Sequence, residues 1–374
     1  MKQTNNAIKF LMAQYRAVFK HAYLASLGAS LVAATALLSA PAAAAAPPQG
    51  PTPATAMDND AFKAFAEQEL VIGDKSSKNN ALTLTAALEK SASTKDVNII
   101  LKGGESTFKG VAAVSGGPGD PVPAKTDLDI SAATLKIDGA DASTKLTVGD
   151  GTNAVKVKLE SLTVTKGTLE LNSAAKATST LETGSITVGA AAESAPSQPD
   201  AIVKIGASGV LGKTGAQITV NATGKVSASG EGAKLIGNVA ISGGTVAADE
   251  SMTIGGDLTA TTGSLSTAGG KTATVTGNAT FTGNDSLSNA GNLVIQGDAV
   301  FADKSVKEST GSVTFTKTAS MNGDTLKKLM TGDVKSADNA NAVITLSNSG
   351  SVGLDSKGLT LIMAILRNDR DHIS

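Results

Sequence analysis

The sequence predicts an all-β protein: a single-stranded parallel β-helix, or solenoid, with about 20 residues per coil and a short N-terminal capping helix. Three observations lead to this fold class. Variants of one phrase, TGNATFTGND (276–285), recur at a nearly constant interval, apolar residues alternate within each copy, and turn residues separate the copies. Alternation at period 2 is typical of strands, and a repeat of roughly 20 to 50 residues is typical of solenoids, propellers and arrays.

The glycine of this phrase sets the register of the copies. Gly237, Gly256, Gly277 and Gly297 follow one another at intervals of 19, 21 and 20 (256−237, 277−256, 297−277), and an Asn or Asp follows each of them. An aliphatic residue lies two places before each glycine, and a further copy has Lys317 in the glycine position. Such a unit is too short for a four-stranded propeller blade but suits one coil whose strands pair with those of the next coil.

The glycine and the residue after it predict a corner of the coil. Glycine populates φ > 0 without steric cost, and Asn or Asp tolerates the same region or forms a local side-chain turn. We therefore interpret the phrase as a corner with its two flanking strands, and not as a chemical site.

The start of the repetitive body predicts an N-terminal cap, because a terminal coil otherwise exposes strand edges and core. Phe62 and Phe65 predict one helical turn. Helical spacing also appears at Leu84, Ala87, Leu88 and Ser91. A compact strand follows at 97–101. Residues 58–96 are thus expected to form a helical cap, and residues 97–358 the solenoid.

The N-terminus predicts export. An apolar run from Leu24 to Leu38 follows the basic residues Lys2, Lys9, Arg16 and Lys20. The run is about 15 residues long, short of the roughly 20 that span a bilayer. It leads into an alanine tract with A-x-A cleavage points near Ala42 to Ala46, as in a secretory signal peptide. We interpret residues 1–46 as the signal peptide and 47–57 as a flexible, Pro-rich linker.

The composition leaves little chemistry for an enzyme. Formal net charge is −1 and no dense Lys/Arg block occurs in the body, which argues against nucleic acid as a partner. Cysteine is absent, and residues 97–353 contain no Arg, His, Tyr or Trp. We predict no catalytic, cofactor-binding or metal-binding residue, no cofactor and no specific small-molecule partner. His372, in the tail, has no evident partner.

Two acidic pairs are the nearest approach to a site. Alternation places Asp127 and Asp129 on one strand face, where two carboxylates could hold calcium or act as acid and base. Asp249 and Glu250 form the second pair. For the first pair, solvated carboxylates on an outward face are the favoured interpretation. Asp150, in VGDGTN, lacks the repeated nonapeptide of calcium-loaded β-rolls and predicts a plain turn.

The last residues, 359–374, form an atypical tail. An apolar run from Leu359 to Leu366 lacks alternation, and Arg367 and Arg370 follow it. One explanation is a short capping helix formed by Leu361, Ile362, Ile365 and Leu366. The other, which we favour, is a truncated or frame-shifted end. Deleting the tail distinguishes them, because loss of a genuine cap lowers the melting temperature and promotes aggregation.

Two of these features resemble bacterial autotransporter adhesins. The long region NNAIKFLMAQYRAVFKHAYLAS is similar in layout to their extended signal peptides. The amphipathic segment, first strand and glycine turn ahead of Phe108 resemble the entry to right-handed β-helix proteins of the pectin-lyase-like kind, over roughly residues 80–355. The resemblance implies a right-handed solenoid passenger associated with a Gram-negative outer membrane. It implies export machinery and host surfaces, extracellular matrix or other cells as partners. Autotransporters continue into a membrane barrel, whereas this chain ends LIMAILRNDRDHIS.

We therefore expect a secreted, cell-surface structural or adhesin-type protein that is not an enzyme. A polysaccharide-degrading β-helix lyase or hydrolase is the first alternative; its activity on uronate polymers would depend on Asp127 and Asp129. An S-layer-like envelope component is the second, and it would form ordered two-dimensional arrays.

Overall fold

The computed structural model describes residues 55–65, 67–74, 79–88, 96–113, 124–139, 143–174, 177–191, 200–337, 342–347 and 350–353. The chain divides into two units, Met1–Pro53 and Ala54–Ser374, and all described residues belong to the second. The predicted signal peptide (1–46) and the atypical tail (359–374) lie outside the described residues. So does most of the predicted linker.

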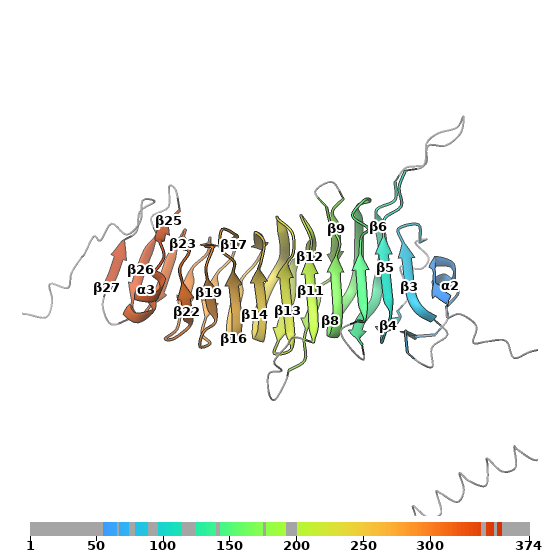
Figure 1. Cartoon of the computed structure of the whole chain (residues 1–374), viewed down its shortest axis with the longest axis horizontal. Helices are drawn as coiled ribbons and strands as arrows, with labels where there is room; N and C mark the ends of the chain where they lie inside the picture. Colours follow the sequence, from blue (N-terminus) through green and yellow to red (C-terminus); the bar gives the residue numbers. More distant parts are fainter. Residues whose placement is uncertain are drawn as a thin grey trace, which may run out of the picture. The chain divides into compact units, whose positions relative to one another are not determined.

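The described unit is a β-solenoid, as the sequence predicts, and it has about 11 turns. Each regular coil contributes three strand segments, and each segment pairs in parallel with its equivalent in the next coil (Figure 1). The strands therefore form three parallel sheets, which we call I, II and III. Long strands bend around the corners; β8 (Val155–Leu171) crosses from sheet III through sheet I into sheet II.

Sheet I contains, besides part of β8, the strands β2 (Glu69–Ile72), β4 (Asn98–Leu101), β6 (Asp127–Asp138), β10 (Ser185–Val188), β12 (Val210–Asn221), β14 (Ala233–Ala248), β16 (Leu258–Thr267), β18 (Ala279–Phe281), β21 (Ala299–Phe301), β24 (Thr318–Met321) and β26 (Val343–Leu346). Sheet II contains parts of β8, β14 and β16 together with β1 (Thr55–Met57), β3 (Asn79–Thr85), β5 (Glu105–Lys109), β7 (Lys145–Val148), β11 (Ala201–Ile205), β13 (Gly224–Ala228), β19 (Leu287–Asn289) and β22 (Val306–Ser309). Sheet III contains parts of β6, β8, β12 and β14 together with β9 (Ser179–Glu182), β15 (Met252–Ile254), β17 (Thr272–Val275), β20 (Asn292–Ile295), β23 (Ser312–Phe315) and β25 (Val334–Ser336).

The core consists of stacks of equivalent residues that point inward. The aliphatic position two places before the corner glycine forms one such stack, with no exposed surface at Leu235, Ile254, Val275, Ile295 and Phe315. In sheet I the rings of Phe281 and Phe301 stack with centroids 5.0 Å apart. Alternation therefore places one apolar residue of every pair in the core, as expected for strands covered on one side.

The coil length is regular only in the C-terminal half. Residue numbers along the stack from Leu235 to Phe315 increase by 19, 21, 20 and 20 (254−235, 275−254, 295−275, 315−295). Towards the N-terminus, insertions lengthen the coils, for example to 36 residues between Asn98 and its register partner Thr134. The mean advance is about 23 residues per turn.

The corner glycines are required mainly by close approach between coils, which corrects our expectation of positive φ. Of the four, Gly237 alone has a positive φ, +134°. A Cβ on Gly297 would lie 2.3 Å from the carbonyl oxygen of Gly277, and one on Gly256 would lie 2.4 Å from that of Gly237. Stacked corners leave no room for a side chain at these positions.

The Asn or Asp after each glycine bonds to the next coil, not to its own turn. The side-chain oxygens of Asn238, Asp257, Asn278 and Asp298 accept hydrogen bonds from the amide nitrogens of Asp257, Asn278, Asp298 and Thr318, at 3.1, 2.8, 2.9 and 3.2 Å. We call this series the Asn/Asp ladder. It satisfies one backbone donor per corner, and Asn alternates with Asp, so no two carboxylates are adjacent.

The predicted helical cap over 58–96 is wrong for most of its described length. Residues 79–85 form β3, in which Leu82 and Leu84 are fully buried, and β2 precedes it in sheet I. Pairing across coils selects alternation over the helical spacing seen at Leu84, Ala87 and Leu88. Thr55–Met57, at the end of the predicted linker, is β1, which pairs with β3. The solenoid thus begins before residue 97.

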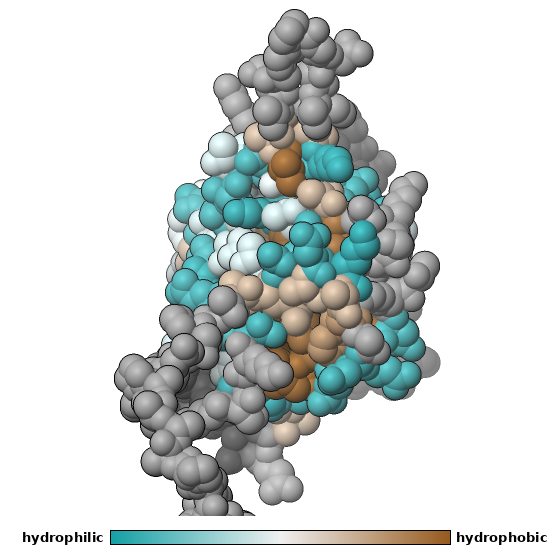
Figure 2. All heavy atoms as spheres, turned by 90° about the vertical axis from the view of Figure 1, so that its right-hand side faces the viewer, coloured by the Kyte–Doolittle hydropathy of each residue, from teal (hydrophilic) through white to brown (hydrophobic). Residues whose placement is uncertain are grey.

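A helix does cover the N-terminal end, at Phe62. Helix α2 (Asn59–Ala64) is capped by Asp58, buries Phe62 completely and packs against β3. Figure 2 looks at this end of the solenoid and shows apolar side chains surrounded by hydrophilic ones. At the other end, helix α3 (Gly323–Leu329) packs against β22, the last described strand of sheet II, and β27 (Gly350–Gly353) pairs antiparallel with β26.

Candidate functional site

The first acidic pair lies on the outer surface of sheet III, as alternation predicts. Asp127 and Asp129 both face outward from β6, in register with Lys156 and Lys158 of the next coil. Lys158 lies 3.6 Å from Asp129, and the amide of Ser131 donates to the same carboxylate. Partial burial alone would raise the pKa of Asp129, but these hydrogen bonds and Lys158 outweigh it and lower the pKa. A carboxylate held ionised in this way is a poor general acid.

The second acidic pair is divided between two coils. Asp249 lies 3.6 Å from Lys225, on the preceding coil, whereas Glu250 bonds to Lys271 at 2.5 Å, on the following coil. The two carboxylates therefore serve separate ion pairs. Asp150 forms the plain turn that we predict: its side chain accepts hydrogen bonds from the amides of Thr152 and Asn153.

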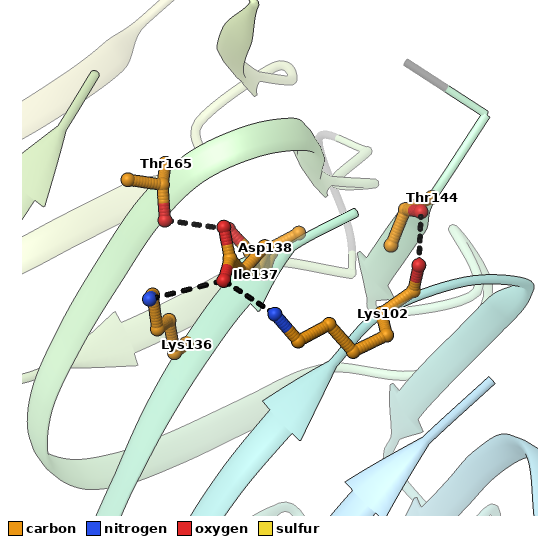
Figure 3. Close-up of polar contacts among 6 residues, drawn as sticks. All are labelled: Lys102, Lys136, Ile137, Asp138, Thr144 and Thr165. Atoms are coloured by element: carbon orange, nitrogen blue, oxygen red, sulfur yellow. Dashed lines mark hydrogen bonds and ion pairs between the residues drawn. The ribbon is translucent and has the colours of Figure 1, made fainter. Parts of the chain in front are cut away.

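The most connected polar cluster joins the outer corners of β4 and β6. Lys102 and Lys136 both contact one oxygen of Asp138, at 2.6 and 3.0 Å (Figure 3). The Thr144 hydroxyl donates to the carbonyl of Lys102, and that of Thr165 donates to the carbonyl of Ile137. The hydrogen bond from Lys102 lowers the pKa of Asp138, against the effect of burial, and Lys136 lowers it further. The contacts in Figure 3 join β4, β6 and β8, which lie on successive coils, so we assign the cluster a structural role.

A shallow hollow of about 350 Å³ lies beside α3. Its lining combines charges of both signs: Asp303, Lys304, Asp324, Thr325, Lys327 and Lys328. Lys328 donates to the carbonyl of Val306 at 2.6 Å, and Asn322 donates to Asp303 at 2.9 Å. Because opposite charges are mixed in the lining, and internal contacts engage Asp303 and Lys328, the hollow does not select a ligand of either sign.

The outer surface of sheet I differs from these clusters because it repeats. In nine successive strand segments, from β8 to β26, one outward position forms a continuous row: Thr163, Thr187, Thr219, Ala240, Thr259, Thr280, Val300, Ser320 and Thr345. We call this the threonine row. Successive members lie on paired strands, so they are about 4.8 Å apart, and eight steps extend roughly 38 Å.

The nine strand segments that form the threonine row contain no charged residue. The same coils bear charges on the other two surfaces: sheet II has Glu170, Lys204 and Lys225, and sheet III has Lys156, Lys158, Glu182, Lys234 and Lys335. The corner that precedes these segments carries charges of both signs. Asp257 and Asp298 belong to the Asn/Asp ladder, and Glu160, Lys213 and Lys317 lie at the same corner of other coils. From β8 to β26 the outer surface of sheet I therefore bears no charge, although Lys136 of β6 occupies the equivalent position one coil earlier. The outer surfaces of sheets II and III bear charges within the same coils.

Neither the threonine row nor the Asp138 cluster was predicted from the sequence. The threonine row could have been predicted from the sequence, because the similar segments SLTV, SITV and QITV recur at 161–164, 185–188 and 217–220, each with Thr as its third residue. No local pattern predicts the Asp138 cluster, since Lys102 and Asp138 are 36 residues apart across a lengthened coil.

No group of three His, Cys, Asp or Glu side chains that could hold a metal ion occurs among the described residues. Within the same residues, no helix is both long and apolar enough to cross a membrane.

Comparison with known proteins adds no relative. The chain matches no family model, and neither a curated protein nor a solved structure is significantly similar to it.

Proposed function

We propose that this chain is an exported, cell-surface structural protein of the adhesin type, in which the solenoid acts as a stalk and a low-specificity adhesive surface. The observation that carries the proposal is repetition: the described coils present one outward pattern again and again, with its polar groups in ladders and ion pairs. A long surface of repeated weak contacts suits adhesion, where many contacts add up, better than turnover of one bond.

Support for export comes from the leader. A basic region, an apolar run of about 15 residues and an alanine tract with A-x-A points together have the order of a secretory signal peptide. Thr, Ser and Asn on the outer surfaces, over a Val/Ile/Leu/Ala core, suit a long solvated element outside the cell.

Export is tested by expressing the full chain with a C-terminal epitope tag in a Gram-negative host. We expect a processed form outside the inner membrane that protease degrades on intact cells. A matched variant with Leu31→Arg and Leu37→Arg in the apolar run should stay unprocessed and protected. Equal protection of both forms would contradict the proposal.

The enzymatic alternative has its own test. Purified protein is incubated with uronate polymers and assayed for unsaturated and reducing ends. We expect no turnover above that of the Asp127→Asn/Asp129→Asn variant. Turnover that this double substitution abolishes would replace the adhesin proposal with a polysaccharide-cleaving enzyme.

A further inference from the structure

We infer that the threonine row on sheet I is a binding surface for an extended, neutral polysaccharide that lies along the stack of coils. This inference rests on the proposed adhesive function and names the class of partner. Three properties of the surface lead to it: its lack of charge, its spacing and the chemistry of threonine.

The lack of charge selects against charged partners. A polyanion such as an acidic polysaccharide would need Lys or Arg along the surface, but the nine strand segments have none. The adjacent corner adds charges of both signs, Glu160, Asp257 and Asp298 against Lys213 and Lys317, and so offers no continuous positive strip to a polyanion. Polycations would find three separated carboxylates, interspersed with two lysines, beside a length of roughly 38 Å. A neutral polymer is therefore the partner whose binding to the threonine row costs the least desolvation free energy.

The spacing suits a repeating polymer. Parallel pairing fixes one outward side chain about every 4.8 Å, and a pyranose unit advances an extended polysaccharide by a similar distance. Thr187, Thr219, Thr259 and Thr280 are all half-buried by their neighbours, and a β-branched side chain has few χ1 states in a strand. Little side-chain entropy is therefore lost on binding.

Threonine matches the chemistry of a sugar. Its hydroxyl both donates and accepts hydrogen bonds, and its methyl group is apolar. Sugar rings likewise present hydroxyl and C–H groups together. Val300, which is 44% exposed, and Ala240 add apolar contact in the same row. Without aromatic rings each coil contributes little, so affinity must come from many coils acting on one long chain.

A second copy of the chain is a weaker candidate for this surface. Homodimer interfaces are about 65% apolar by area. In the threonine row, Ala240 and Val300 are the aliphatic members and the other members carry a hydroxyl group. Two such faces would bury more hydroxyl groups than they could pair.

The test compares two triple variants that differ only in the side they change. Thr219→Lys/Thr259→Lys/Thr280→Lys charges the threonine row. The matched control changes half-buried threonines of sheet III: Thr253→Lys, Thr274→Lys and Thr314→Lys. Purified proteins are mixed with microcrystalline cellulose or chitin, and the bound fraction is measured with and without soluble oligosaccharides of increasing length. Circular dichroism and light scattering check folding and oligomeric state.

We expect the wild type to bind at least one of these polymers, and longer oligosaccharides to compete better than mono- or disaccharides. The row variant should bind at least tenfold more weakly, while the control stays within about twofold of the wild type. Three outcomes overturn the inference: no wild-type binding to either polymer, equal loss in both variants, or a wild-type dimer that the row substitutions convert to monomer. None of them bears on export, which the protease test measures separately.

Discussion

At the scale of single residues, position within the coil decides what each side chain does. Val275 and Asn278 are near neighbours in the chain, yet Val275 is fully buried in the core stack and Asn278 is exposed on the Asn/Asp ladder. The ladder bond of Asn278 to the amide of Asp298 is 2.9 Å long and lies at the surface. A change at the first position should therefore cost far more stability than one at the second.

We expect Val275→Asp to destabilise the solenoid by on the order of 3 to 5 kcal/mol, because a carboxylate would be buried without a partner. Asn278→Ser should cost less than about 1 kcal/mol, the value of one exposed hydrogen bond. The shift in urea midpoint measures both, and equal shifts would show that the register of this coil is wrong.

The corner glycines supply a second comparison. Gly297→Ala places a Cβ 2.3 Å from a backbone carbonyl of the preceding coil, so the coils must separate and the melting temperature should fall by several degrees. Gly323→Ala, at the start of α3, has open space around its Cβ and should be neutral or slightly stabilising, since alanine favours helix. Thermal unfolding of the two variants checks this; similar melting temperatures would contradict the close-approach explanation.

At the scale of elements, polar contacts tie neighbouring strands together where the coils are irregular. Lys102, at the end of β4, reaches Asp138, at the end of β6, across a coil of 36 residues. A depressed pKa means that the folded protein favours the ionised form of Asp138. The resulting stabilisation is present above the unfolded pKa, about 3.8, and is lost as the pH falls through the lower folded value.

Asp138→Asn should accordingly lower the melting temperature at pH 7, and the difference from the wild type should shrink as the pH is lowered below about 3.8. Lys102→Met removes the largest cause of the shift, so it should reduce this pH dependence without abolishing it. Melting curves at several pH values test both. A constant difference between wild type and Asp138→Asn across this range would mean that the ion pair does not stabilise the fold.

Helix α3 depends on its N-cap. The side chain of Asn322 accepts a hydrogen bond from the amide of Thr325 and donates one to Asp303. We expect Asn322→Ala to cost about 1 kcal/mol. Asn322→Ser keeps an N-cap acceptor and should recover part of that loss, as measured by denaturant midpoint. Identical midpoints for wild type and the alanine variant would show that the cap carries no stability.

At the scale of the whole molecule, the solenoid is a one-dimensional array in which each coil contacts its neighbours. The segment 272–291 makes up one complete coil, because Thr272 and Asn292 are register partners. Deleting this coil joins Lys271 to Asn292, which occupies the same position in its coil as the deleted Thr272. Every remaining strand therefore keeps a partner in its own sheet.

We therefore expect the deletion of 272–291 to retain a far-UV circular dichroism spectrum dominated by β-structure, with a modest fall in melting temperature. The control deletion, 272–281, removes half a coil and brings strands of different sheets into line, so it should aggregate or lose cooperative unfolding. If both deletions behave alike, the coils are not independent modules. A mainly helical wild-type spectrum would contradict the solenoid itself.

The sequence alone determined the features that depend on local periodicity. Alternating apolar residues define an inner and an outer face of each strand, and the nearly constant interval between the glycines from Gly237 to Gly297 defines the coil. Both signals are repeated, so each copy supports the others, and the core stack through Val275 could be aligned before any contact was known.

Only the tertiary structure decided what depends on stacking. Leu84 fits helical spacing as well as strand alternation, and its place in β3 is settled by pairing with Phe108 of β5, on the next coil. The glycines are needed because another coil approaches them, and Asp249 and Glu250 separate because their lysines lie on opposite neighbours. The physical reason is common to all three: these are contacts between coils, and residues a whole coil apart in the chain leave no local pattern that specifies which atoms will meet.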